Sequence, residues 1–135
     1  MAEEFSFELV SPEKLLLAEE VDMVVVPGAE GDFGVLVGHA PLISSLRPGV
    51  IDTYNGGKVA DRIFVAGGFA EVTSERCTVL AEEAIPVKDI NSANAEERLK
   101  VAKEAILGAD NDTLRNAAEI ELTVAEAMLA AGRAA

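Results

Sequence analysis

The glycine-rich stretch 28–34 holds the densest cluster of residues that could do chemistry, with Glu30 and Asp32 standing among its glycines. Two neighbouring carboxyl groups could act as a general acid and base, and a glycine-rich loop could hold a phosphate. The stretch lacks the Lys-Ser/Thr ending of a nucleotide loop and opens into apolar, strand-like sequence instead of a helix. Its acids would also repel phosphate. We interpret the glycines as turn residues of a rigid, exposed, acidic loop that is suited to contact a partner.

His39 is the single histidine and Cys77 the single cysteine. A catalytic histidine needs a nucleophile and an orienting group, and the sequence does not place Ser44 or Ser45 beside His39. One histidine and one distant cysteine also do not form a zinc site. His39 is therefore better explained as a structural or interface residue, and Cys77 as a small core residue. The sequence predicts no catalytic residue, no metal site and no cofactor.

Length, charge and hydropathy limit the class of protein. The 135 residues are 50% apolar, which is enough for a core, and the net charge of −13 disfavours nucleic acid as a partner. The lone cysteine and the lack of a secretory-signal pattern point to a reducing, cytoplasmic setting. No apolar run approaches the roughly twenty residues that a membrane-spanning helix needs.

The composition changes along the chain and predicts two modules, residues 1–87 and 88–135. Thirteen of the 15 valines and all five prolines precede Ile90, whereas residues 93–135 contain 13 alanines. Valine favours strands and alanine favours helices. The expected strands are residues 5–9, 21–26, 33–37, 42–46, 50–54, 58–65, 68–73 and 77–81. Because no helix fits between these strands, parallel crossovers are excluded and the first module is predicted to be an antiparallel β-sandwich.

Two local sequence signals, one for a turn and one for a helix cap, locate elements within the two modules. Asn55-Gly56-Gly57 predicts a tight hairpin between two strands. Asn94, with Glu97 three residues on, is the expected cap of a first helix that ends at Gly108.

A second helix is expected after the polar bend that follows the first. Its apolar residues recur at helical spacing, and they are Leu114, Ala118, Leu122, Ala125 and Leu129. Two amphipathic helices joined by a short loop predict an antiparallel hairpin. Its small alanines bury little area, so we expect it to dock on a further surface.

Several stretches together resemble the epsilon subunit of the bacterial rotary ATP synthase. They are residues 7–13, 26–36, 38–42, 47–49, 67–69 with 71–72, and 78–81. The resemblance covers the whole chain and implies a small, non-catalytic rotor subunit. It implies that the sandwich lies beside the gamma subunit and on the ring of proton-carrying subunits. The helical hairpin would extend transiently toward the alpha and beta subunits and restrain ATP hydrolysis.

The resemblance also implies where contact with the ring and gamma occurs. The implied contact residues are Glu30, Gly31, Asp32, Phe33, Gly34 and His39. An acidic sandwich would be repelled by anionic lipid, so membrane association is expected through protein partners only. The implied location is the cytoplasmic face of the bacterial inner membrane, as a peripheral subunit.

The helical module departs from the family at positions that matter for regulation. Some members bind ATP through a motif in which Arg stands three residues after an Asp, but here Ser92 follows Asp89 at that spacing. A serine cannot replace a guanidinium on phosphate, so weak or absent ATP binding is expected. Strong inhibitors present basic hairpins, whereas this one is net negative and has few bases, among them Arg98 and Arg115. We predict weak inhibition.

Two other classes of protein remain as alternatives. One is a free-standing β-sandwich binding module with a helical appendage. The other is a small hydrolase that would use His39 with a carboxylate, and a His39→Ala substitution would abolish its activity.

Overall fold

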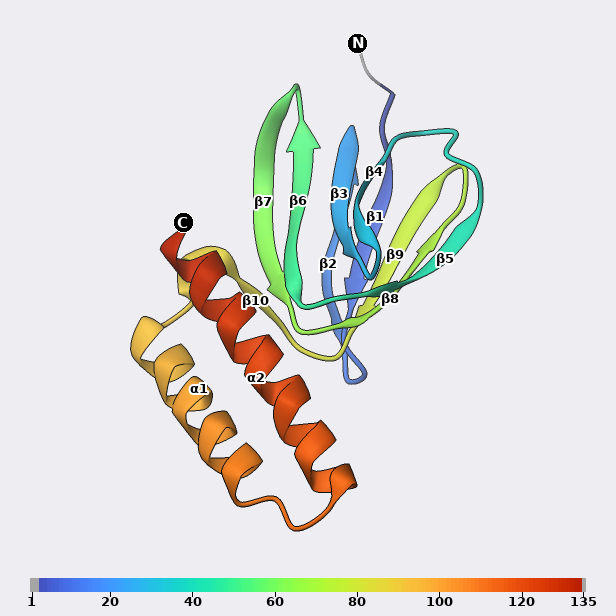
Figure 1. The fold of residues 1–135 in the computed structure, drawn as a ribbon. Helices are drawn as coiled ribbons and strands as arrows, with labels where there is room; N and C mark the ends of the chain where they lie inside the picture. Colours follow the sequence, from blue (N-terminus) through green and yellow to red (C-terminus); the bar gives the residue numbers. More distant parts are fainter. Residues whose placement is uncertain (1–2, 135) are drawn as a thin grey trace. The chain divides into compact units, whose positions relative to one another are not determined.

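The computed structural model describes residues 3–134 and separates the chain into two compact units, one up to Pro86 and one from Val87 onward. Figure 1 shows the strands of the first unit and the helices of the second. The strands are β1 (Phe5–Val10), β2 (Leu15–Val21), β3 (Met23–Gly28), β4 (Gly31–Val35), β5 (Leu42–Leu46), β6 (Gly49–Asn55), β7 (Lys58–Val65), β8 (Gly68–Val72), β9 (Arg76–Ala81) and β10 (Ala84–Pro86).

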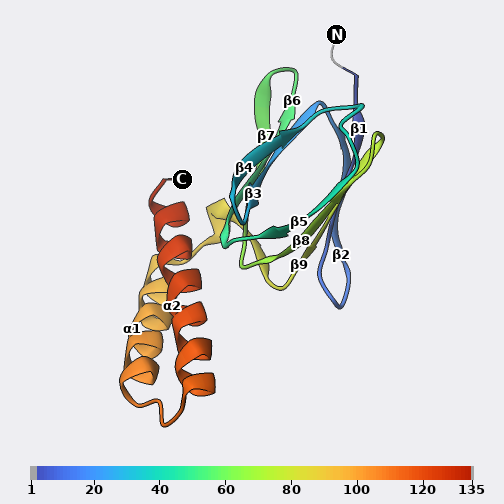
Figure 2. The same ribbon diagram turned by 45° about the vertical axis from the view of Figure 1, so that its right-hand side comes forward.

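One ten-stranded sheet bends round on itself to form the two layers of a sandwich (Figure 2). Its strand order is β10-β7-β6-β3-β5-β8-β9-β1-β2, and β4 pairs with β3 alone. Alternate residues of both layers point inward and form one apolar core, because successive side chains of a strand face opposite sides. The largest completely buried side chains of this core are Phe7, Leu9, Val21, Val24, Val26, Val35, Ile51, Val65, Val72 and Val79. The β-sandwich followed by a helical hairpin that the sequence predicts is confirmed.

Two strands were not expected from the sequence. β2 is Leu15–Val21, whose Leu-Leu-Leu-Ala-Glu-Glu is typical of a helix, but its pairing with β1 makes it a strand. β10 has three residues and pairs with the end of β7. The hairpin expected at Asn55-Gly56-Gly57 is present, with both glycines at positive φ. Tertiary pairing therefore adds strands that local patterns do not show.

The expectation of a purely antiparallel sheet is wrong at one pair. β1 runs parallel to β9, with Phe7 opposite Cys77 and Leu9 opposite Val79. A helical crossover is needed only where two parallel strands follow each other along the chain. Here seven strands of the sandwich lie between the two in sequence, so the intervening sheet brings the chain back without a helix.

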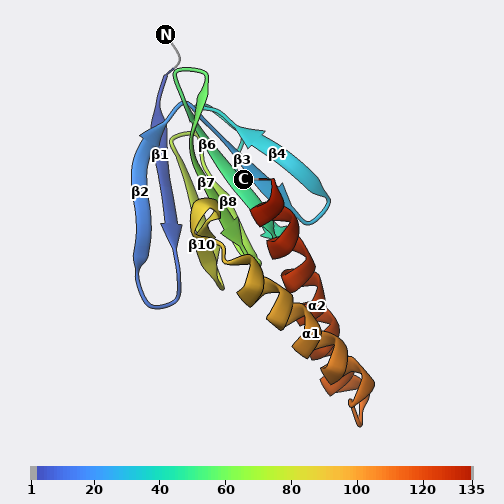
Figure 3. The same ribbon diagram turned by 90° about the vertical axis from the view of Figure 1, so that its left-hand side faces the viewer.

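The second unit consists of η1 (Val87–Asp89), α1 (Ser92–Leu107) and α2 (Asp112–Arg133). Figure 3 shows the two α-helices side by side and antiparallel. The sequence suggested Asn94 as the cap of α1, but Asn94 is not the capping residue. Asn91 caps it, because its side chain accepts a hydrogen bond from the Asn94 N–H at 3.1 Å. Asn111 caps α2 in the same way, through the N–H of Leu114.

Candidate functional site

The acidic loop 28–34 is a tight hairpin between β3 and β4. Gly28 lies opposite Gly31, and Ala29 and Glu30 form the two-residue turn between them. Gly31 has φ +142°, which disfavours any other residue. A Cβ on Gly28 would lie 2.6 Å from the Gly31 carbonyl oxygen. The glycines therefore serve the turn, and they hold the Glu30 side chain out at its tip.

Arg47, which the sequence did not single out, clamps this hairpin from the loop after β5. Its Nη1 donates to the Gly28 carbonyl oxygen at 2.6 Å, and its Nη2 donates to the Asp32 carboxylate at 2.5 Å. Its backbone N–H donates to the Pro27 carbonyl at 3.0 Å. Residues far apart in sequence thus form one rigid unit around the turn. Sequence spacing gives no signal for this contact, because its partners lie on separate hairpins.

The contact residues expected within the hairpin have different environments. Glu30 is exposed at the tip, and Gly31 and Gly34 are exposed beside it. Asp32 is exposed but forms an ion pair with Arg47 inside the chain. Phe33 is half-buried and packs against the core. Glu30 is therefore the acidic side chain that the turn presents most directly to a partner.

His39 lies apart from this tip, beyond the other end of β4. With five residues in β4 at about 3.3 Å each, the two ends are separated by more than about 13 Å. The His39 Nδ1–H donates to the Ala40 carbonyl oxygen at 2.7 Å, and the neighbouring Gly38 N–H donates to Ser74 at 2.8 Å. The structure thus does not bring His39 and Glu30 into one patch.

An exposed apolar stripe crosses the outer face of the sheet, and the sequence analysis did not identify it. We define it as Val10, Leu15, Ile43, Phe69 and Leu80. Phe69 lies directly opposite Leu80, Leu80 opposite Val10, and Val10 opposite Leu15, on four neighbouring strands. Ile43 extends the stripe onto β5 and is 71% exposed, while Phe69 is 55% exposed. Side chains this apolar, aligned across strands, are typical of a surface that a protein partner covers.

The stripe and the acidic hairpin are joined through Ser45 on β5. The Ser45 carbonyl accepts the N–H of Ala29 in the turn at 2.9 Å, and Ser45 lies opposite Phe69 in the sheet. The clamp residue Arg47 follows two positions later. One end of the sandwich therefore carries an apolar surface and an acidic tip on a common backbone framework.

Cys77 is buried in β9 and faces the core. Burial raises the pKa of its thiol from 9.0 to about 12, because the thiolate would lose its hydration. The thiol is thus a packing group. Across residues 3–134, no group of three or more His, Cys, Asp or Glu side chains could hold a metal ion.

The regulatory residues expected in the helical unit are spread along it. Asp89 ends η1, and Ser92 begins α1. Arg98 on α1 binds Glu121 on α2 at 3.2 Å, whereas Arg115 binds Asp112 within α2 at 2.8 Å. Each of these two arginines therefore has an acidic partner in the same unit.

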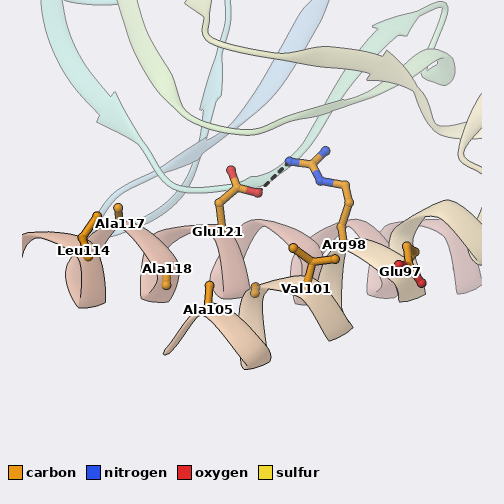
Figure 4. A pocket seen from close by; sticks show the side chains of 9 residues that line it. Glu97, Arg98, Val101, Ala105, Leu114, Ala117, Ala118 and Glu121 are labelled. Carbon is orange, nitrogen blue, oxygen red and sulfur yellow. Dashed lines mark hydrogen bonds and ion pairs between the residues drawn. The ribbon is translucent and has the colours of Figure 1, made fainter. Parts of the chain in front are cut away.

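A groove of about 370 Å³ lies between the two helices (Figure 4). Its lining is mostly apolar and includes Val101, Ala105, Leu114 and Ala117. The Arg98–Glu121 pair borders it, as Figure 4 shows. An apolar groove whose bordering arginine pairs with a glutamate offers little to a nucleotide phosphate.

A β-sandwich with an apolar stripe and a clamped acidic hairpin, followed by a helical hairpin, defines a subunit that acts by binding other proteins. Within the part of the chain that the structure covers, no helix is both long enough and apolar enough to span a membrane.

Comparison with known proteins narrows this class to one family. Residues 4–87 match the family model described as ATP synthase, Delta/Epsilon chain, beta-sandwich domain. The ATP synthase epsilon chain of Paramagnetospirillum magneticum is 61% identical over 131 residues, which are 97% of this chain and 98% of that protein. That of Rhodospirillum rubrum is 55% identical over the same shares.

A solved structure supports the same assignment. A chain of the Euglena gracilis mitochondrial ATP synthase, in a structure of OSCP, F1 and c-ring, matches with a TM-score of 0.80 and 28% identity. The match covers 95% of this chain and 81% of that one. A chain from the central stalk and c-ring of the Tetrahymena thermophila enzyme shares the fold, with a TM-score of 0.69 at 14% identity. The protein belongs to the ATP synthase epsilon chain family and is a non-catalytic subunit.

Proposed function

We propose that this subunit stands in the central stalk of a proton-translocating ATP synthase, between the gamma subunit and the ring of proton-carrying subunits. There it helps couple proton flow through the ring to ATP synthesis by the catalytic sector. It is a peripheral subunit, attached through its protein partners at the cytoplasmic face of the bacterial inner membrane. Its family membership over nearly the whole chain supports this role, as does its likeness to a chain solved with F1 and a c-ring.

The observation that carries the proposal is the apolar stripe, to which we assign the gamma subunit. Phe69 and Leu80 form a cross-strand pair with 55% and 47% of their surfaces exposed. Burial of a large apolar side chain is worth about 1.5–3 kcal/mol, so these two residues can anchor a partner. A rotor contact must transmit torque, and a paired sheet provides a stiff support for such anchors.

We assign the ring contact to the acidic hairpin. Glu30 and Gly31 stand at its tip, while Asp32 is held by Arg47 and Phe33 by the core, so the tip is presented on a rigid base. A rim-exposed charge pair at such a contact contributes about 0–1 kcal/mol and serves mainly for orientation. His39 lies at the other end of β4 and belongs to a separate contact, which we place on gamma.

The helical hairpin restrains ATP hydrolysis only weakly through transient contact with the alpha and beta subunits. Arg98 and Arg115 are its candidate contact cations, but each already binds an acidic side chain of its own unit. Breaking these internal ion pairs costs free energy, which offsets part of the gain from a new ion pair with a partner subunit. Asp89 and Ser92 are placed where relatives with an ATP motif have Asp and Arg, and we propose that this hairpin is not gated by ATP.

A pair of matched substitutions tests the assignment of the stripe. Phe69→Glu places a charge in the stripe, whereas Val59→Glu places one on β7 at a similarly exposed apolar residue outside it. We expect Phe69→Glu to weaken binding to purified gamma subunit at least about tenfold, as loss of an anchor worth over 1.4 kcal/mol requires. Val59→Glu should bind like the wild type. If the wild type, Phe69→Glu and Val59→Glu bound gamma equally, each with an unchanged circular dichroism spectrum, the stripe would not be the gamma contact. That result would favour a free-standing binding module.

A further inference from the structure

The sandwich is not closed all round, because β2 forms one end of the sheet's strand order. β2 pairs with β1 on one side. On its other side it lies against β6, with no strand pairing to β6 or β7 among the described residues (Figure 1). We call this boundary the seam. Side chains must hold β2 in place across it, since no ladder of backbone hydrogen bonds does so.

Two carboxyl groups meet at the seam. Glu19 on β2 lies opposite the buried Phe7 and therefore points inward, whereas the next residue, Glu20, is exposed. Asp61 on β7 and Thr53 on β6 are register partners on the far side of the seam. Thr53 is completely buried, and its Oγ1 accepts the backbone N–H of Asp61 at 3.0 Å. Asp61 and Thr53 are the two groups whose side chains interact with the Glu19 carboxyl.

One oxygen of the Glu19 carboxyl lacks a hydrogen-bond donor, although the Thr53 side chain hydrogen-bonds to the group. Its Oε1 is buried and has no partner. A buried acceptor left unsatisfied costs free energy, and an ionised Asp61 can only accept as well. One proton between the two carboxyl groups would supply the missing donor and remove one of two facing charges.

The surrounding charges do not relieve this conflict. On β6 and β7, Asp52 and Arg62 pair with each other at 3.0 Å, at the positions that alternate with Thr53 and Asp61. On β1, the inward residue opposite Glu19 is the apolar Phe7. Burial first, and then the neighbouring Asp61, raise the pKa of Glu19 above 4.5, while Thr53 lowers it by a smaller amount.

Glu20 and Glu8, which point outward on β2 and β1, have hydrogen-bond or ion-pair partners of their own. Glu20 accepts a hydrogen bond from Ser6 at 3.0 Å, and Glu8 on β1 pairs with Arg76 on β9 at 3.4 Å. Lys58, at the start of β7, is exposed near the hairpin turn. No cation is among the groups that act on Glu19.

We propose that Glu19 and Asp61 form a proton-controlled latch across the seam, in which one shared proton holds β2 against β6 and β7. Loss of that proton leaves two facing carboxylates, which loosen the edge strand. The folded state then binds a proton that the unfolded chain releases near pH 4.5. The contribution of this pair to the unfolding free energy is therefore largest below pH 4.5. It falls as pH rises through the pKa of Glu19 in the folded protein.

The direct test is a carbon-detected NMR titration of the side-chain carboxyl groups in the full chain. We expect Glu19 to titrate above 4.5, and the Asp61→Asn substitution to lower its midpoint by removing the facing acid. Glu20→Gln, which changes the adjacent exposed carboxyl on the same strand, should leave the Glu19 midpoint unchanged. A Glu19 midpoint at or below 4.5, or one that Asp61→Asn does not move, would overturn the latch.

Hydrogen exchange supplies a second readout that a merely structural carboxyl would not move. After correction for intrinsic rates, the β2 amides of the wild type should exchange faster once pH passes the Glu19 midpoint. Glu19→Gln keeps the shape of the side chain and supplies a permanent donor, so its β2 protection should not change across that pH range. If the two proteins show the same pH dependence, the proton does not control the seam.

Discussion

The Arg47 clamp makes a prediction whose size can be worked from the structure. The guanidinium forms two different bonds: one to the carbonyl of the buried Gly28 and one to the exposed Asp32 carboxylate. A hydrogen bond from a charged donor contributes about 1.5–3 kcal/mol. An ion pair between groups that are 43% and 60% exposed contributes about 0–1 kcal/mol. The carbonyl contact should therefore dominate.

We expect Arg47→Ala to lower the free energy of unfolding by about 2 kcal/mol and Asp32→Ala by less than about 1 kcal/mol. The loss of unfolding free energy for Arg47→Lys should lie between the losses for Asp32→Ala and Arg47→Ala, since an ammonium group cannot reproduce the two bonds of the planar guanidinium. Arg76→Ala is the control, because it removes a surface pair with Glu8 on the same sandwich at 3.4 Å. Its effect should be near zero.

The assay is urea unfolding followed by tyrosine fluorescence. The chain has one tyrosine, Tyr54, and no tryptophan, and Tyr54 lies on β6. The signal therefore reports on the sandwich, while circular dichroism follows the helices separately. An Arg47→Ala protein as stable as Arg76→Ala, or an Asp32→Ala protein as destabilised as Arg47→Ala, would show that the contact with the Gly28 carbonyl does not dominate.

Three further predictions concern the helical unit and the core. Calorimetry with the full chain should detect no ATP binding in the micromolar range, because Ser92 offers no guanidinium to phosphate; a micromolar affinity would contradict this. Deleting residues 90–135 should raise ATP hydrolysis of the assembled enzyme by less than about fivefold, the equivalent of ~1 kcal/mol of exposed charge contact, and a many-fold larger increase would show a strong brake. With its pKa raised to about 12, the Cys77 thiol should react with iodoacetamide at pH 8 about a thousandfold more slowly in the folded chain than in urea, and similar rates would show that the thiol is accessible.

The fold was predictable where local pattern and tertiary pairing agree. β6 and β7 are rich in β-branched and aromatic residues and flank Asn55-Gly56-Gly57, so the strands and their turn could be located from the sequence. β2 could not, because Leu and Glu in its sequence favour a helix and only the pairing with β1 makes it a strand. The parallel register of β1 and β9 depends on how the whole sheet returns, which no local window contains.

Of the candidate site, only the acidic turn could be predicted from the sequence. The glycines and Glu30 mark the acidic turn within seven residues of sequence. The Arg47 clamp joins residues 15 to 19 positions apart, and the stripe joins Val10 to Leu80 through sheet register, so neither leaves a periodic signal. The same holds for Glu19 and Asp61, which look like ordinary solvated acids until the seam places them together.

The central claim is that this chain works as a subunit held by gamma and the ring, and co-purification tests it most directly. The chain would be tagged at its C-terminus in its own host, membranes solubilised gently, and the captured proteins identified and quantified by mass spectrometry. The account predicts alpha, beta, gamma and ring subunits in a fixed ratio to the tagged chain, and loss of that ratio for Phe69→Glu but not for Val59→Glu. Recovery of the wild-type chain alone, from cells whose ATP synthase is intact, would contradict it.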